Sequence, residues 1–300
     1  MSYFKKRLEI KEIIRQSLKE DIGRNDITTE LLIPGDKVAQ AVLLAKDNFI
    51  VCGSETARFA FTVLDKKVKY IAKVGDGRYV KKGEVLALIE GKAASILTAE
   101  RTALNFLSFL SGVATATGQY VNAVKPYKVK IVDTRKTIPG LRQLQKYAVK
   151  IGGGYNHRMK LDEMVLIKDN HIRVINSLGP RRKDWRNKVT SIENMVKDIR
   201  PKIPQGMKVE IEVENLKQFK EALKEKPDII MLDNMKINDI RKAVSIKLQA
   251  PKSKPHTFLE ASGGITLRNV RKFAATGVDM ISVGALTHSV NSVDISLEFL

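Results

Sequence analysis

Short apolar runs alternate with amphipathic helical stretches through the second half of the chain. Runs typical of buried strands fall at 128–132, 164–167, 207–213, 228–232, 257–260 and 279–283. Between them, apolar positions at helical spacing predict helices at 141–151, 190–200, 215–225, 237–247 and 267–275. This rhythm is typical of a parallel sheet with helical crossovers, and six strands within about 155 residues favour a closed barrel.

The first third of the chain has a different pattern. A broad apolar stripe predicts a helix over residues 3–20, and residues 20–29 are predicted to be a loop. From 38 to 90, short β-rich segments alternate with turns, which resembles the small sandwich of biotinyl and lipoyl carriers. No Met-Lys-Met tip is present. The likeness therefore concerns the fold alone.

An uncharged stretch, 102–124, joins the two patterns. It contains several polar residues, and its apolar residues Ala103, Phe106, Leu107, Leu110, Val113 and Ala114 follow helical spacing. This favours a buried helix over a membrane span, and the prediction is that Glu100 opens it. Arg101, near this predicted start, either pairs with Glu100 to cap the helix or points into a site.

Composition narrows the class of protein. The 300 residues are 43% hydrophobic, which suits two domains or one barrel with an addition. A single cysteine, Cys52, and a charged N-terminal segment predict a reducing cytoplasm and no export by a signal peptide. The net charge of +20 suggests nucleic acid first. However, the lysines are scattered, only 6% of residues are aromatic and no recognition motif occurs, so an anionic small-molecule substrate explains the charge better.

Cationic side chains gather where two predicted strands end. Between 133 and 171 lie Arg135, Lys136, Arg142, His157, Arg158, Lys168 and His171, interrupted by Pro139-Gly140 and by three consecutive glycines. The carboxyl ends of strands are where α/β proteins hold ligands, and glycines let the backbone approach a ligand closely. A solvated basic face is the alternative, but the mixture with Gly, Asn and Asp at strand ends favours an anion site.

Acidic and glycine-rich segments follow the later strands. Glu210 and Glu212 are two residues apart on one predicted strand and therefore share a face, and Asp233 ends the next strand. These carboxylates are either structural counter-ions or groups that bind Mg²⁺ or ribose hydroxyls. Two short segments, 262–264 and 282–284, follow the last two strands, where barrels commonly hold a phosphate through backbone N–H groups.

Four motifs identify a family. The segments ERTALN, TRKTIPGLR, KYAVKIGGGYNHR and LIKDNH resemble the quinolinate phosphoribosyltransferases, also called nicotinate-nucleotide pyrophosphorylases (carboxylating), and the likeness runs from about Glu20 to Leu297. It implies an N-terminal α/β sandwich domain, residues 1–112, to which the tail 286–300 is expected to add. An incomplete (β/α) barrel of the type II phosphoribosyltransferase kind, residues 113–285, is expected to follow.

The resemblance also implies an activity, namely transfer of phosphoribosyl from 5-phosphoribosyl-1-diphosphate to quinolinate with decarboxylation, for NAD biosynthesis. Its catalytic groups would be Lys136, Lys168, Glu212 and Asp233, with Mg²⁺ on Glu212 and Asp233 through the donor. The quinolinate carboxylates would meet Arg101, Arg135, His157, Arg158 and Lys168, and the diphosphate would meet Lys136 and Lys168. Ser262, Gly263, Gly264 and Gly284 would hold the 5-phosphate.

Assembly and rival functions follow from the same likeness. Family members form homodimers, so Arg101 is expected to act in the partner's site, with the apolar face of 103–114 as contact area; higher assembly stays open. Rivals are a nicotinate-using relative, a protein associated with molybdate transport and a non-catalytic nucleic-acid binder. Ile138 and Lys160 depart slightly from the family pattern. The basic insert 176–190 is predicted to be a solvated loop.

Overall fold

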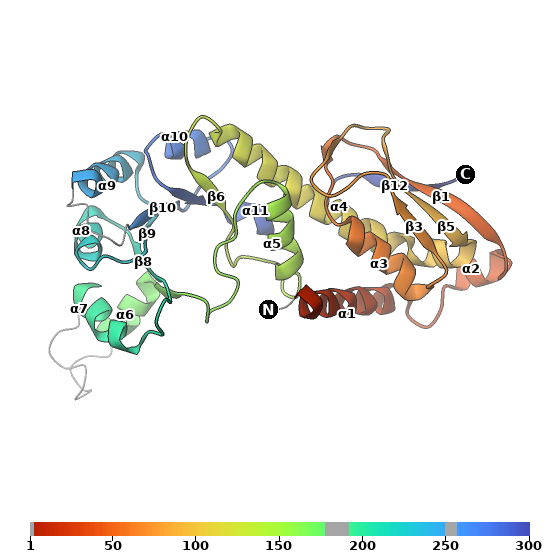
Figure 1. The fold of residues 1–300 in the computed structure, drawn as a ribbon, viewed down its shortest axis with the longest axis horizontal. Helices are drawn as coiled ribbons and strands as arrows, with labels where there is room; N and C mark the ends of the chain where they lie inside the picture. Colours follow the sequence, from red (N-terminus) through yellow and green to blue (C-terminus); the bar gives the residue numbers. More distant parts are fainter. Residues whose placement is uncertain (1–2, 178–191, 250–256) are drawn as a thin grey trace. The chain divides into compact units, whose positions relative to one another are not determined.

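The computed structural model describes residues 3–177, 192–249 and 257–300, and it divides the chain into two compact units (Figure 1). The first unit comprises Met1–Gly118, Lys136–Gly154 and Leu286–Leu300, and the second comprises Gln119–Arg135 and Tyr155–Ala285. Each unit contains its own sheet. The α/β fold class predicted from the sequence, with an antiparallel sheet and a separate parallel one, is confirmed.

The first unit is built on a four-stranded antiparallel sheet in the order β12-β1-β5-β3. Its strands are β1 (Val38–Ala45), β3 (Lys69–Ala72), β5 (Val85–Lys92) and β12 (Ile295–Phe299), and β2 (Phe49–Ile50) pairs separately with β4 (Tyr79–Val80). Its helices include α1 (Tyr3–Ile22), α2 (Ile27–Leu32), α3 (Ser54–Leu64) and α5 (Arg142–Ile151). The C-terminal strand β12 thus pairs with β1, far from it in sequence.

Two predictions about this unit are wrong. The segment 20–29 is not one loop, because α1 continues to Ile22 and α2 begins at Ile27, where the Asp26 side chain accepts a hydrogen bond from the Thr29 N–H. Residues 54–64 form a helix and not part of a run of strands. The N–H groups of Gly53 and Ser54 both donate to the carboxylate of Asp76. This distant residue thus gives hydrogen-bond acceptors to backbone N–H groups that have no partner within the first turn of α3.

The long helix α4 (Ala93–Val124) begins well before Glu100, so the predicted start is also wrong. Arg101 therefore lies inside the helix. The predicted apolar stripe is confirmed, since Ala103, Leu107 and Val113 are among its buried residues. Across the three described ranges, no helix combines the length and the apolar character that a bilayer crossing requires.

The second unit is built on a six-stranded parallel sheet in the order β6-β11-β10-β9-β8-β7. Its strands are β6 (Lys130–Val132), β7 (Val165–Ile167), β8 (Val209–Val213), β9 (Ile229–Asp233), β10 (Phe258–Ser262) and β11 (Met280–Ser282). All six predicted strands are present. Among the described residues β6 and β7 do not pair, so the closed barrel favoured by the rhythm is wrong and the incomplete barrel is confirmed.

The free edge of β6 is covered by a later segment. Val132 bridges to Tyr155, and the Tyr155 N–H donates to the Ile131 carbonyl at 2.8 Å. This pairing gives hydrogen-bond partners to backbone groups of β6 that would otherwise be exposed at the edge of the sheet. It also carries residues 156–158 past the carboxyl end of β6.

Helices connect the strands of this unit. They are α6 (Asp169–Ser177), α7 (Ile192–Ile199), α8 (Leu216–Lys224), α9 (Ile237–Gln249) and α10 (Val270–Ala274), with the 3-10 helix η2 (Arg200–Lys202) after α7. The short α11 (Ala285–His288) follows β11, and all but its first residue belongs to the first unit. Figure 1 shows α8 and α9 together on one side of β8 and β9. Most of the insert 176–190, predicted to be a solvated loop, lies outside the described residues.

Candidate active site

The carboxyl ends of the parallel strands gather most of the predicted site residues at one edge of the sheet. Arg135 follows β6, Lys168 follows β7, and Glu212 lies near the end of β8. Asp233 ends β9, Ser262 ends β10, and Gly284 follows β11. Because parallel strands share one direction, residues from distant parts of the chain lie at the same edge, where α/β proteins bind ligands.

Glu212 and Asp233 form the acidic part of this edge. Both side chains are partly exposed, and they stand at the ends of the adjacent strands β8 and β9. Burial and the negative charge of Asp233 raise the pKa of Glu212, while Lys168 acts in the opposite direction. Lys168 is held by a hydrogen bond from its backbone N–H to His171 Nδ1 at 3.0 Å. A lysine and two carboxylates therefore lie close enough to influence one another electrostatically.

The segment after β10 has the shape of a backbone cradle. Gly263 has a φ of +92°, and a Cβ added there would lie 2.1 Å from Asn234 Oδ1, so only glycine fits. Gly264 has a φ of +60° and no atom within 4 Å of an added Cβ. Asn269 Nδ2 stabilises the loop by donating a hydrogen bond to the Gly264 carbonyl at 2.9 Å. The loop therefore presents exposed backbone beside open space.

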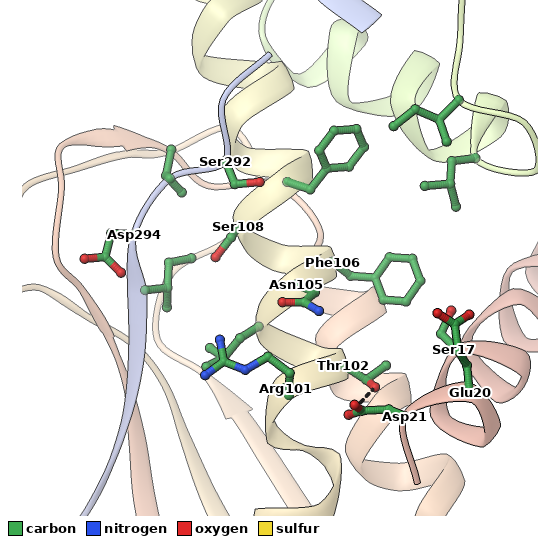
Figure 2. Close-up of a pocket in the computed structure, with 16 residues that line it drawn as sticks. Ser17, Glu20, Asp21, Arg101, Thr102, Asn105, Phe106, Ser108, Ser292 and Asp294 are labelled. Carbon is green, nitrogen blue, oxygen red and sulfur yellow. Dashed lines mark hydrogen bonds between the residues drawn. The ribbon is translucent and has the colours of Figure 1, made fainter. Parts of the chain in front are cut away.

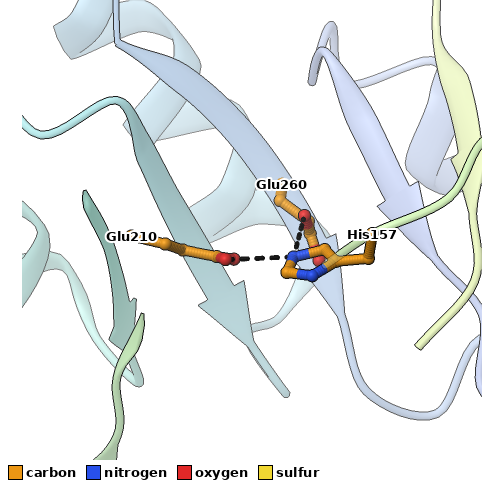
Figure 3. Close-up of side chains that lie close together, drawn as sticks. All are labelled: His157, Glu210 and Glu260. Carbon is orange, nitrogen blue, oxygen red and sulfur yellow. Dashed lines mark ion pairs between the residues drawn. The ribbon is translucent and has the colours of Figure 1, made fainter. Parts of the chain in front are cut away.

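Behind this edge, His157 meets two fully buried carboxylates (Figure 3). His157 Nε2 lies 3.0 Å from Glu210 Oε2 and 3.5 Å from Glu260 Oε2, and both glutamates are 0% exposed. Burial lowers the pKa of His157, but the two carboxylates outweigh it and raise that pKa. Burial and the charge of Glu260 raise the pKa of Glu210 to about 7. The two carboxylates thus favour hydrogen on the Nε2 atom that faces them.

A third buried acid, Asp133, anchors the backbone beside His157. Its Oδ1 accepts from the His157 N–H at 2.9 Å, and its Oδ2 accepts from Asn156 Nδ2 at 2.5 Å. The next residue, Arg158, donates from Nη1 to the Met164 carbonyl at 2.8 Å. Burial and the positive charge of Arg135 lower the pKa of Arg158, so the two guanidinium groups repel each other electrostatically.

Sequence reasoning did not identify the whole of this cluster. Glu210 was considered only as a neighbour of Glu212, while Glu260 and Asp133 were assigned no role. A signal was present, since Glu260 is the one charged residue in the run FLEAS and an unpaired charge inside a buried strand is costly. That signal could indicate a special position for Glu260 but not its partner His157.

The two other predicted site residues, Arg101 and Lys136, belong to the first unit. Both are exposed. The Lys136 carbonyl accepts from Thr287 Oγ1 at 2.6 Å, so the backbone of the 136–141 loop is fixed at its start. Further along that loop, the Ile138 N–H donates to Gln145 Oε1 at 2.8 Å.

Arg101 lines a cavity of about 670 Å³ within the first unit. Figure 2 shows its guanidinium on one side of α4, while Thr102 faces Asp21 of α1. The remaining lining comes largely from α4 and from residues 292–295. Most apolar residues of 103–114 are buried within this same unit, whereas Phe109 is partly exposed and lines the cavity.

Comparison with known proteins agrees with the motifs. The model of the quinolinate phosphoribosyl transferase C-terminal domain matches residues 113–298, and that of the N-terminal domain matches residues 26–111. The chain is 41% identical over 292 residues to a probable nicotinate-nucleotide pyrophosphorylase [carboxylating] of Methanocaldococcus jannaschii, covering 96% of each chain.

Solved structures give the same answer. The nicotinate-nucleotide pyrophosphorylase of Francisella tularensis is 39% identical and superposes with a TM-score of 0.85, over 97% of this chain and 96% of the other. Human nicotinic acid phosphoribosyltransferase, at 11% identity and a TM-score of 0.57, covering 88% of this chain and 70% of the other, shares the fold alone. The chain belongs to the quinolinate phosphoribosyltransferase family.

Proposed function

We propose that the chain transfers phosphoribosyl from 5-phosphoribosyl-1-diphosphate to quinolinate. The products are nicotinate mononucleotide, diphosphate and carbon dioxide, as expected for an enzyme of NAD biosynthesis. The observation that carries the proposal is the gathering of cations, paired carboxylates and a glycine cradle at one edge of the parallel sheet, in a chain of this family. Both substrates are polyanions, and the edge offers each of them matching groups.

Quinolinate is a planar dicarboxylate, and arginine binds such groups through two parallel hydrogen bonds. Arg135 and Arg158 are the main candidates, because their guanidinium groups already lie near each other despite their like charges. A bound dianion would relieve that repulsion. Lys168 and the positive charge of the partner's Arg101 complete the proposed acceptor site, while His157 supports it from behind.

The donor is assigned to the other groups of the edge. Lys136 and Lys168 neutralise the diphosphate, and the backbone of Ser262, Gly263, Gly264 and Gly284 holds the 5-phosphate. Glu212 and Asp233 accept hydrogen bonds from the ribose hydroxyls, and carboxylates on two neighbouring strands suit the ligand preference of Mg²⁺. Mg²⁺ bound with the donor would reduce the negative charge of the diphosphate as it leaves.

The chain's residues act mainly by electrostatics. As diphosphate leaves, positive charge develops at the anomeric carbon, and the carboxylates of Glu212 and Asp233 stabilise it. The quinolinate nitrogen then forms the new bond without a covalent enzyme intermediate. In the decarboxylation, the bond from the adjacent ring carbon to its carboxylate breaks. The electron pair stays on that carbon beside the cationic nitrogen, and a proton replaces the carbon dioxide that leaves.

A direct assay tests the function. Purified protein with quinolinate, the diphosphate donor and Mg²⁺ is followed for nicotinate mononucleotide, and nicotinate replaces quinolinate as the control. Turnover with quinolinate and none with nicotinate is expected. Turnover only with nicotinate would instead identify the nicotinate-using relative. Binding of DNA or RNA without any turnover would identify a nucleic-acid binder.

The proposed assembly is a homodimer in which Arg101 acts in the partner's site. It is supported by the exposure of Arg101 and by the cavity beside it. Arg101→Ala and Lys136→Ala are each expected to be inactive. Mixed and exchanged, they form heterodimers with one intact site, so about a quarter of wild-type activity should return under random pairing. Confirmed exchange without any recovered activity would rule out action across the interface.

A further inference from the structure

The cluster of His157, Glu210 and Glu260 has no role in the reaction described so far. The side chains of both glutamates are 0% exposed, and His157 is only 9% exposed. Burying two carboxylates beside each other is costly unless their neighbours compensate for the lost water. Glu210 and Glu260 come from β8 and β10, and alternate strands of a barrel contribute the side chains of one interior layer. The cluster is therefore built into the inside of the second unit.

The orientation of the imidazole is fixed by its other nitrogen. The backbone N–H of Arg158 donates to His157 Nδ1 at 2.9 Å, and the position of that hydrogen follows from the backbone. Nδ1 therefore holds a lone pair, and the ring is neutral with its hydrogen on Nε2, although the two carboxylates by themselves favour the doubly protonated ring. Nε2 faces Glu210 and Glu260, as Figure 3 shows.

A metal ion does not fit these three side chains, although one nitrogen and two carboxylates could serve as ligands. A histidine that binds a metal through Nε2 donates its other ring N–H to an acceptor. Here Nδ1 accepts a hydrogen bond instead, so Nε2 carries hydrogen and has no lone pair to offer. The carboxylates therefore serve the imidazole itself.

The imidazole in turn fixes the segment that carries Arg158. On one side Asp133 accepts from the His157 backbone N–H, and on the other side the ring accepts from the Arg158 backbone N–H. The guanidinium of Arg158 then reaches the Met164 carbonyl. Small displacements of such a group are costly, because a misplacement of about 1 Å can reduce catalysis about 100-fold.

We propose that Glu210 and Glu260 are positioning residues for quinolinate binding, which act through His157 to hold the backbone and guanidinium of Arg158 in place. The inference rests on the proposed function, since it concerns the acceptor site of that reaction. Glu210 is the closer of the two to Nε2 and has the larger share of the effect. The donor site is assigned to other residues, so its affinity should be unaffected.

Steady-state kinetics of Glu210→Ala and Glu260→Ala test the proposal. Each variant should raise the KM for quinolinate about 10-fold or more, Glu210→Ala the most, while the KM for the donor stays within about twofold. Glu210→Gln and Glu260→Gln keep an oxygen that can face Nε2–H, so they should keep the quinolinate KM within about threefold of wild type.

Thr257→Val is the matched control for damage to the fold. Thr257 is buried just before β10, and its hydroxyl donates to the Pro227 carbonyl at 2.7 Å, at the opposite end of the strand from the site. It should lower Tm without changing either KM. If the alanine variants behave like Thr257→Val, or if the glutamine variants lose as much quinolinate affinity as the alanine variants, the proposal is overturned.

Nitrogen-15 NMR of histidine-labelled wild-type protein examines the ring directly and does not depend on how the variants fold. A neutral His157 with hydrogen on Nε2 and none on Nδ1 is expected, whereas hydrogen on Nδ1 would contradict the proposed hydrogen bonding. Failure of the proposed function looks different, because the wild-type protein would then not turn over quinolinate at all.

Discussion

Two pairs of carboxylates on the same parallel sheet differ in depth and in their partners. The outer pair, Glu212 and Asp233, is partly exposed at the strand ends and lies near Lys168. The inner pair, Glu210 and Glu260, is fully buried and faces His157. Glu210 and Glu212 are only two residues apart on β8 and point to the same face. Two residues along β8 thus separate a carboxylate that can contact a substrate, Glu212, from one that can only support its binding site, Glu210.

Replacing Arg158 should give the largest effect, because this residue connects the two layers. Its backbone N–H contacts the inner layer through His157, and its guanidinium lies near Arg135. Arg158→Ala should leave the fold intact and weaken quinolinate binding by about 2 to 5 kcal/mol, the cost of a lost desolvated charge pair. The KM for quinolinate measures it, with Arg241→Ala on the exposed face of α9 as control. Wild-type affinity in Arg158→Ala would remove this residue from the acceptor site.

Asp233→Asn tests the outer pair. If Asp233 meets positive charge in the transition state, kcat should fall about 100- to 1,000-fold while Tm changes little. Asp239→Asn is a matched control, because Asp239 is a surface acid on α9 paired only with Lys242 among the described residues. Should Asp233→Asn unfold, with normal specific activity in its folded fraction, Asp233 would be a structural counter-ion.

The outer layer could be predicted from the sequence far better than the inner one. Lys168 and Asp233 come directly after apolar runs, and Arg135 follows such a run three residues after Val132, so their position at strand ends follows from local pattern. The partnership of His157 with Glu260 depends on strand order and on the pairing of Tyr155 with β6, which no local pattern contains. Helix α3 was missed for a related reason. Its Phe, Thr and Val residues favour strands, and the acid that satisfies its first turn, Asp76, lies in a later turn.

The inner pair should reduce stability more than the outer pair, in which the pKa of Glu212 is raised in the same direction. Glu210 has its pKa raised from 4.5 to about 7, chiefly by burial and then by the charge of Glu260. The folded state therefore binds more protons than the unfolded state in this range, and stability falls as pH rises from 4.5 to about 7. Glu260→Gln removes one of the two charges. Its Tm should exceed that of wild type at pH 8, with a smaller gain at pH 5, as measured by calorimetry. A lower Tm at pH 8 would mean that the charge of Glu260 stabilises the fold.

The smallest effect is expected at the glycine cradle, which shows the same contrast between enclosed and open positions. An alanine at Gly263 would collide with Asn234, whereas an alanine at Gly264 meets no atom within 4 Å. Gly264→Ala should therefore cost only the left-handed backbone conformation, about 1 kcal/mol. Because its methyl group would enter the space assigned to the 5-phosphate, the KM for the donor should rise while the KM for quinolinate stays unchanged. A donor KM equal to that of wild type would show that the phosphate does not lie against Gly264.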